Sequence, residues 1–209
     1  MIPVKVLAVR YLANASPALC RALGAPKGYP ALAMLTTDCD DATYIALDAA
    51  TKAADVQVAY GRSFYAGAAN ASTPNAGEVI GILAGQTPGA VRSGMEAALS
   101  ALQRLGFEEA NQVPYLAHTV SSVGSFLAKE ADVQPGTALA YLIAPPLEGM
   151  YAMDAALKAA DVTLRKLYAP PSETNFGGGL LSGTQSACDA ACAAFAAAVA
   201  EVAARPVEM

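Results

Sequence analysis

This chain of 209 residues has little charge and few side chains suited to catalysis or metal binding. Only 15% of its residues are charged, tryptophan is absent, and there is one histidine. The net charge is −5 and Lys and Arg form no run, so we expect no nucleic-acid partner. The four cysteines form no CxxC pair, and with a single histidine they predict neither a metal site nor a cofactor.

Catalytic motifs are missing as well. The chain has no GxSxG sequence, and the glycine run Gly177–Gly179 lacks the lysine of a phosphate-binding loop. His118 lies in a strand-like stretch, where a histidine is more often a packing residue than a catalyst. We therefore predict that the protein is not an enzyme and has no catalytic residue.

Membrane and secretion signals are also not evident. The first residues, MIPVKVLAV, enter strand-like sequence without the layout of a signal peptide. The most apolar run, Ala190–Ala200, lies between Asp189 and Glu201 and is too short to span a bilayer. We expect a cytoplasmic protein with no membrane partner, whose cysteines are small core residues in a reducing compartment.

What the sequence does contain is a repeat. The stretch ALDAATKAADV at Ala46–Val56 returns 106 residues later as AMDAALKAADV at Ala152–Val162. Nine of the eleven positions are identical, and the spacing is half the chain length, which indicates a duplication. Both copies are rich in alanine and free of Gly and Pro, so each predicts a helix. We predict two domains, residues 1–107 and 108–209.

The order of elements supports an α/β fold in both halves. Each half predicts the order β-α-β-α-β-β-α, which implies a small mixed sheet covered by helices. In the first half the expected strands are Ile2–Arg10, Ala31–Thr36, Val56–Tyr60 and Val79–Ala84. The stretch Phe107–Pro114 is expected to be a linker. Because 55% of residues are hydrophobic and few are charged, we expect apolar surface to be buried between subunits.

Several motifs give the chain a family resemblance. The segments DDATYIA, YGRSFYAGAA, YLIAPP and PPSETN, together with the paired DA-x-x-KAA-x-V helices, resemble the shell proteins of bacterial microcompartments, in particular tandem members from ethanolamine-utilisation compartments. The last strand of the family domain comes first in each half, so both domains look circularly permuted. The family forms flat hexameric tiles. The resemblance therefore implies a homotrimer with six domain wedges, which assembles with other shell proteins in the cytoplasm.

The resemblance also implies roles for particular positions. Lys52 and Lys158, at matched places on the two repeat helices, would lie on the tile edge. For one lysine alone a solvated helix-end charge would be favoured, but the recurrence and the family position reverse that. The loops 61–77 and 169–177 would line a gated central pore for small metabolites or cofactors. Their large side chains, Phe64, Tyr65 and Phe176, could close it.

A small-ligand site is the last expectation. Asp40 and Asp41 begin the first repeat helix, Glu78 precedes a strand, and Phe107 heads the expected linker. Carboxylates with an aromatic face suit a primary ammonium group, and the resemblance implies ethanolamine in a small pore at these positions. The simpler alternative is that the aspartates cap the helix and Glu78 faces solvent.

A second function class stays open at this point. A tandem small-ligand sensor of ferredoxin-like build would also be α/β and duplicated. A sensor would form one discrete oligomer, whereas a shell protein would form extended sheets.

Overall fold

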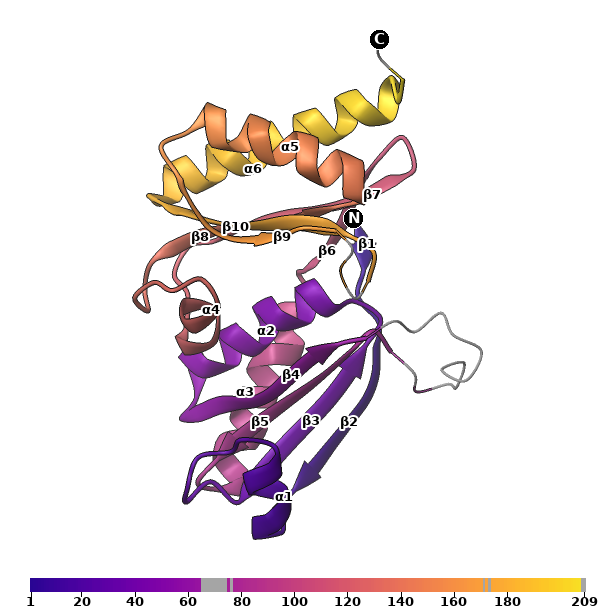
Figure 1. Cartoon of the computed structure of the whole chain (residues 1–209). Coiled ribbons are helices and arrows are strands. Elements are labelled where there is room, and N and C mark those ends of the chain that lie inside the picture. Colours follow the sequence, from indigo (N-terminus) through magenta and orange to yellow (C-terminus); the bar gives the residue numbers. More distant parts are fainter. Residues whose placement is uncertain (65–74, 76, 171, 173, 208–209) are drawn as a thin grey trace. The chain divides into compact units, whose positions relative to one another are not determined.

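The computed structural model describes residues 1–64, 75, 77–170, 172 and 174–207. The chain forms two compact units (Figure 1). The N-terminal unit contains Pro3–Leu105 together with Gly124–Leu127, and the C-terminal unit contains Met1–Ile2, Gly106–Val123 and Ala128–Met209. Each unit thus takes a short segment from the other half of the sequence.

The N-terminal unit has one four-stranded sheet in the order β2-β3-β5-β4. Its elements are β2 (Val6–Leu12), α1 (Pro17–Ala22), β3 (Ala31–Thr37), α2 (Asp40–Ala53), β4 (Val56–Ser63), β5 (Val79–Gly85) and α3 (Pro88–Leu102). Helices α2 and α3 pack against each other and on the sheet (Figure 1). Apolar residues of both helices, including Leu47 and Met95, are fully buried there.

Neighbouring strands of this sheet are antiparallel in all three pairs, where the sequence predicts a mixed sheet. The reason is the position of β5. The connection through α2 makes β3 and β4 parallel to each other, but β5 lies between them and is antiparallel to both. The helix and strand assignments otherwise agree with the sequence predictions to within a few residues at most ends. The exception is the expected strand Ile2–Arg10, which forms two strands in different sheets, β1 (Ile2–Pro3) and β2 (Val6–Leu12).

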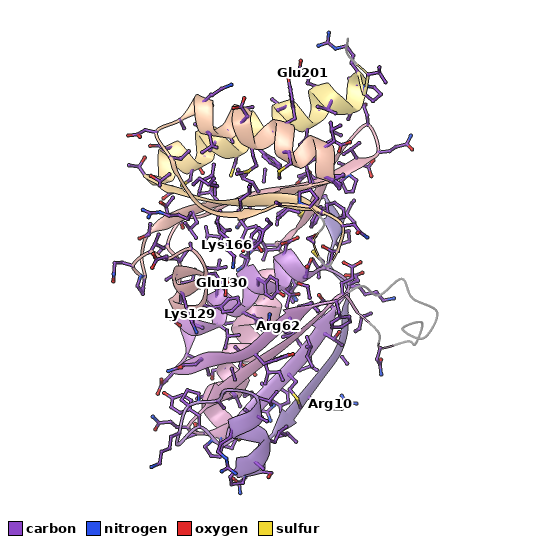
Figure 2. All side chains as sticks on the ribbon, in the orientation of Figure 1. Arg10, Arg62, Lys129, Glu130, Lys166 and Glu201 are labelled. Carbon is purple, nitrogen blue, oxygen red and sulfur yellow. The ribbon has the colours of Figure 1, made fainter. Side chains whose placement is uncertain are left out.

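The C-terminal unit has a six-stranded sheet in the order β1-β6-β7-β8-β10-β9. Its elements are β1 (Ile2–Pro3), β6 (Gly106–Ala110), β7 (Val113–Val120), α4 (Ser125–Glu130), β8 (Ala138–Ala144), α5 (Pro146–Ala159), β9 (Thr163–Tyr168), β10 (Gly177–Gly183) and α6 (Gln185–Ala204). Helices α5 and α6 pack together over the sheet (Figure 1). Lys166 on the edge strand β9 forms an ion pair of 2.5 Å with Glu130 of α4, and Figure 2 labels both.

The expected linker Phe107–Pro114 is a β-hairpin, so that prediction is wrong. Strands β6 and β7 pair with Glu108 opposite Tyr115 and Ala110 opposite Val113. Between them, Asn111 and Gln112 have φ values of 48° and 68°, the left-handed pair that a two-residue hairpin turn needs. The turn was not predicted from the sequence because its asparagine is followed by glutamine and not by glycine.

The glycine run of the second half is a packing feature of β10. Gly178 has a φ of 153°, and a Cβ atom there would clash with the carbonyl oxygen of Leu142 on β8. A Cβ atom at Gly179 would clash with the carbonyl oxygen of Lys166 on β9. The glycines therefore allow three backbones to approach closely.

Helix α6 is apolar over most of its length. By length and composition alone it could cross a membrane, with a mean hydropathy of 1.6 over Gln185–Ala204. Its larger side chains, Phe195 and Val199 among them, are buried in the core of the C-terminal unit. Much of the remaining helix is alanine. The high hydropathy therefore comes from small side chains on a helix that packs on a sheet.

Candidate functional site

Three strand ends and a helix start converge at one end of the N-terminal unit. The N–H of Glu78 donates to the carbonyl oxygen of Thr37 at the end of β3, at 2.8 Å. The N–H of Phe64, just after β4, donates to the carbonyl oxygen of Glu78 at 2.9 Å. Helix α2 begins three residues after β3, at Asp40. The predicted acidic residues of this unit are thereby gathered in one place.

The two aspartates do not serve as the helix N-cap. That position belongs to Cys39, which is extended and makes no side-chain capping bond. Asp40 and Asp41 are the first helical residues, and the Oδ1 atom of Asp40 accepts a hydrogen bond of 2.9 Å from the N–H of Asp41. Both are only 7% exposed. The positive end of the helix dipole favours carboxylates in this turn, but their burial opposes the charge.

The pKa values of the ionisable groups at this site depend on burial and on one another's charges. Burial raises the pKa of Asp40 above its ordinary value, while hydrogen bonds, first from Ser63, act in the other direction. The pKa of Glu78 is raised by burial and then by the charges of Asp40 and Asp38. Burial and the neighbouring carboxylates also raise the pKa of the Cys39 thiol. Burial therefore disfavours the charged forms of these groups, and a bound cation would offset that cost.

Of the predicted aromatic residues, Phe64 adjoins the acidic residues through its backbone, whereas the others lie in the C-terminal unit or outside the described part of the chain. Phe107 belongs to the C-terminal unit, in β6, where its ring meets that of Phe176 edge-on at 5.6 Å. One residue of the predicted small-pore set is thus paired with one of the predicted central-pore set. Phe64 is exposed beside the end of β4. Tyr65 lies outside the described residues.

The two repeat lysines pair with corresponding aspartates, but the surroundings of the two pairs differ. Lys52 lies 3.5 Å from the Oδ2 atom of Asp48, and Lys158 lies 2.5 Å from that of Asp154, each one helical turn away. Lys158 and Asp154 are both well exposed, whereas Asp48 is fully buried. A role at a tile edge stays a prediction for both lysines.

Sequence reasoning missed the function of Asp48. Its Oδ2 atom accepts a hydrogen bond of 2.7 Å from the N–H of Gly124, and its Oδ1 atom accepts one of 2.9 Å from the N–H of Leu127. The neighbouring Thr51 accepts a bond of 3.1 Å from the N–H of Ser125. This carboxylate holds a segment from the second half of the chain on the N-terminal unit. The available signal was an aspartate kept in both repeats within an alanine-rich helix.

Two further features of the described residues concern metal binding and a surface hollow. Within the described ranges, no group of three or more His, Cys, Asp and Glu side chains is arranged to hold a metal ion. A hollow of about 700 Å³ lies beside α1 in the N-terminal unit, lined among others by Cys20, Arg21 and Tyr29. It contains none of the predicted site residues.

Comparison with known proteins finds relatives that match essentially the whole chain. Residues 31–114 match the family model described as the BMC domain. The chain is 55% identical to the bacterial microcompartment shell protein EutL of Clostridium perfringens, covering 99% of this chain and 97% of that one. It is 45% identical to EutL of Escherichia coli, covering 100% and 97%.

A solved structure agrees in fold. The crystal structure of the ethanolamine utilization protein EutL from Leptotrichia buccalis matches with a TM-score of 0.95 and 54% identity, covering 100% of this chain and 98% of that one. The fold is thus two tandem, circularly permuted BMC domains, as predicted. These relatives give no support to the alternative of a ferredoxin-like sensor. The chain belongs to the EutL family of bacterial microcompartment shell proteins.

Proposed function

We propose that this protein is a structural tile in the shell of a bacterial microcompartment for ethanolamine utilisation, located in the cytoplasm, and that it has no catalytic activity. The observation that carries the proposal is a 55% identical shell protein that aligns with 99% of the chain. The same alignment covers both repeats, so both domains of this chain correspond to domains of the relative.

The tile is a ring of three copies. Two domains in each chain supply six wedges, and closed rings of this kind bury large edges. In support, the chain is 55% hydrophobic and leaves large apolar side chains such as Leu164 and Leu167 exposed on the C-terminal unit. Other shell proteins would join the tile at its outer edges, through Lys52 and Lys158.

The loops 61–77 and 169–177 line a central pore for small metabolites or cofactors in this proposal. Each connects the last two strands of its repeat, so both take the same place in their domains. Phe64 and Phe176 lie at the described ends of these loops and are large enough to narrow an opening. Hydrogen exchange with and without ligand would detect a gate, and equal protection of both loops in the two conditions would exclude it.

The buried carboxylates of Asp40 and Asp41 and the half-buried carboxylate of Glu78 take a small primary ammonium ion such as ethanolamine. Asp40, Asp41 and Glu78 converge where burial opposes their negative charge, so a cation that pairs with them is favoured. A role of Phe107, which belongs to the C-terminal unit, stays a prediction from the sequence. Affinity should be weak, because so small a ligand makes few contacts.

Titration calorimetry with ethanolamine tests this site. We expect wild type to bind and the substitutions Asp40→Asn, Asp41→Asn and Glu78→Gln each to weaken binding about tenfold or more. Asp161→Asn is the matched control, since Asp161 is exposed at the end of the second repeat and should leave binding unchanged. Equal heats from all variants, or none from wild type, would end the claim about the ligand while leaving the shell function standing.

A further inference from the structure

The hollow beside α1 has two cations and no carboxylate among the described side chains that line it. Arg21 lies in the last turn of α1, and Lys27 lies in the loop that follows this helix. Both are exposed, and within the part of the chain that the structure describes neither forms an ion pair. In a chain whose net charge is −5, the hollow is a local excess of positive charge.

The other walls of the hollow suit a small organic molecule. Its volume of about 700 Å³ lies within the range of about 300–1,000 Å³ that is usual for ligand pockets. Tyr29 packs against the buried apolar cluster of β3 and β5, and its hydroxyl group donates to the Oδ1 atom of Asp55 at 3.4 Å. Asn14 and Gln86 add amide groups that can donate hydrogen bonds. The hollow thus combines a fixed aromatic wall with several polar donors.

The loop after α1 has a counterpart after α4 with the same backbone conformation. The N–H of Gly24 donates to the carbonyl oxygen three residues earlier, as the N–H of Asp132 does after α4. Gly24 and Asp132 have φ values of 75° and 50°, and Gly28 and Gly136 have φ values of 87° and 91°. The members of each pair are 108 positions apart, as counted on the printed sequence. The two loops can therefore be compared residue by residue.

The side chains of the two loops differ in charge. Four matched positions have a charged residue in one loop or in both: Arg21 with Lys129, Ala22 with Glu130, Gly24 with Asp132, and Lys27 with Pro135. The first loop has two positive charges and no negative one, whereas the second has one positive and two negative charges. Because the backbones agree, the conformation of the loop does not depend on the two cations. Their presence in the first loop therefore points to a ligand.

The second half also shows that such a hollow stays accessible when the adjoining turn is covered. Ser122, Lys129, Gln134 and Gly136 correspond to residues that line the hollow, and all four are exposed. The nearby Leu127, in contrast, is only 1% exposed. A similar cover over the start of α1 in the proposed trimer would therefore leave the hollow open to solvent.

We propose that this hollow binds a small phosphate monoester, with the phosphate between Arg21 and Lys27 and an apolar or aromatic body against Tyr29. A phosphate monoester has a charge of about −1.5 to −2 at neutral pH, which matches two cations better than the single charge of a carboxylate does. The guanidinium of Arg21 can donate two parallel hydrogen bonds to phosphate oxygens, and Lys27 adds a compact charge. The hollow adjoins the start of β3, whereas Asp40 and Glu78 lie at the other end of this strand, so the two sites are separate (Figure 1).

NMR titration with phenyl phosphate tests the class of ligand. Benzoate keeps the aromatic ring with a single negative charge, and phenol keeps the ring without a charge at neutral pH. We expect phenyl phosphate to bind with a dissociation constant of about 1 mM, because so small a ligand makes few contacts. Benzoate should bind about fivefold more weakly or worse, and phenol should not bind measurably. Equal affinities for benzoate and phenyl phosphate would overturn the proposed class, and no binding of phenyl phosphate would overturn the site.

Neutral substitutions locate the bound phosphate. Arg21→Gln and Lys27→Gln should each weaken the binding of phenyl phosphate about fivefold or more. Lys129→Gln is the matched control, because Lys129 is the exposed cation at the corresponding place in the second half. This control should leave the affinity unchanged. An equal loss in all three variants, or no loss in the first two, would overturn the proposed position of the ligand.

An added carboxylate gives the sharpest variant. Gly24→Asp copies the residue of the second loop, where Asp132 has the same left-handed conformation, so the loop should still fold. Within the described residues, a Cβ atom at Gly24 would meet only the carbonyl oxygen of Ala59, at an ordinary distance of 3.6 Å.

We expect Gly24→Asp to weaken the binding of phenyl phosphate about tenfold or more through charge repulsion. Gly24→Asn, which has the same shape without the charge, should keep the affinity within about twofold. Melting temperatures of both variants check that the loop is intact. Equal affinities of the two variants for phenyl phosphate would contradict the proposal, while the shell function and the ethanolamine site would stand.

Discussion

Replacing Asp48 by alanine should cost the N-terminal unit much of its stability. The carboxylate is fully buried and accepts hydrogen bonds from the N–H groups of Gly124 and Leu127, at 2.7 and 2.9 Å. Hydrogen bonds to a charged group contribute about 1.5–3 kcal/mol each, and the substitution leaves both donors without their acceptor. We therefore expect Asp48→Ala to lower the free energy of unfolding by about 3–5 kcal/mol. Asp48→Asn, which keeps one acceptor oxygen, should lose about half as much.

The assay is urea unfolding combined with hydrogen exchange of the peptide that contains Gly124 and Leu127. Exchange there should accelerate strongly in Asp48→Ala, because the local contact opens before the unit unfolds. Asp154→Ala is the matched control for the separated chain, since the exposed pair with Lys158 is worth only about 0.3–0.5 kcal/mol. A loss below about 1 kcal/mol in Asp48→Ala, with unchanged exchange, would refute the role assigned to this carboxylate.

Three further predictions concern the acidic site, the glycine run and the tile edge. Because the pKa of Asp40 is raised, its contribution to stability is full below the ordinary carboxyl pKa and is lost as pH rises through the raised value. Asp40→Asn should therefore raise the melting temperature more at about pH 8 than at about pH 4. An equal shift at both pH values would contradict this prediction. Gly178→Ala should lower the free energy of unfolding of the C-terminal unit by about 3 kcal/mol or more in urea unfolding. Gly89→Ala, at an open helical position of the N-terminal unit, should change the free energy of unfolding of its own unit by less than about 1 kcal/mol, and similar values for the two substitutions would contradict the prediction. The double substitution Lys52→Ala with Lys158→Ala should leave the trimer intact in sedimentation and reduce sheet formation in electron micrographs, and unchanged sheets would remove the lysines from the edge.

The pattern of the sequence was sufficient for most elements of the fold. The alanine-rich repeats are the helices α2 and α5, and Thr87 and Thr184 cap α3 and α6 through their hydroxyl groups. These signals are local, since they depend on propensity and capping within a few residues. Strand β6 was missed because its short sequence, GFEEA, contains two charged residues and is followed by a turn without glycine.

The sequence indicated only part of the arrangement around Asp40. Asp40, Asp41 and Glu78 lie at element ends, and the sequence order shows that such ends can meet. Cys39 as the N-cap could not be predicted, because cysteine is not a preferred capping residue. The place of Phe107 in a hairpin against Phe176 depends on long-range strand pairing, which no local pattern reveals. The division of the chain at residues 107 and 108 stays a prediction.

The exchange of short segments between the units was also invisible in the sequence. Met1–Ile2 belongs to the C-terminal unit and Gly124–Leu127 to the N-terminal unit. Asp48 is identical in both repeats, yet one copy is buried and the other exposed, because the burial comes from a segment far away in sequence. Identity between repeats therefore did not show which copy carries a structural contact.

Electron microscopy of the purified wild-type protein tests the central claim, that this chain is a shell tile, most directly. The account predicts extended sheets of six-sided particles, each a ring with a native mass of about 64 kDa, three times the 21.2 kDa chain. A discrete oligomer that never extends into sheets, alone or with other shell proteins, would contradict it.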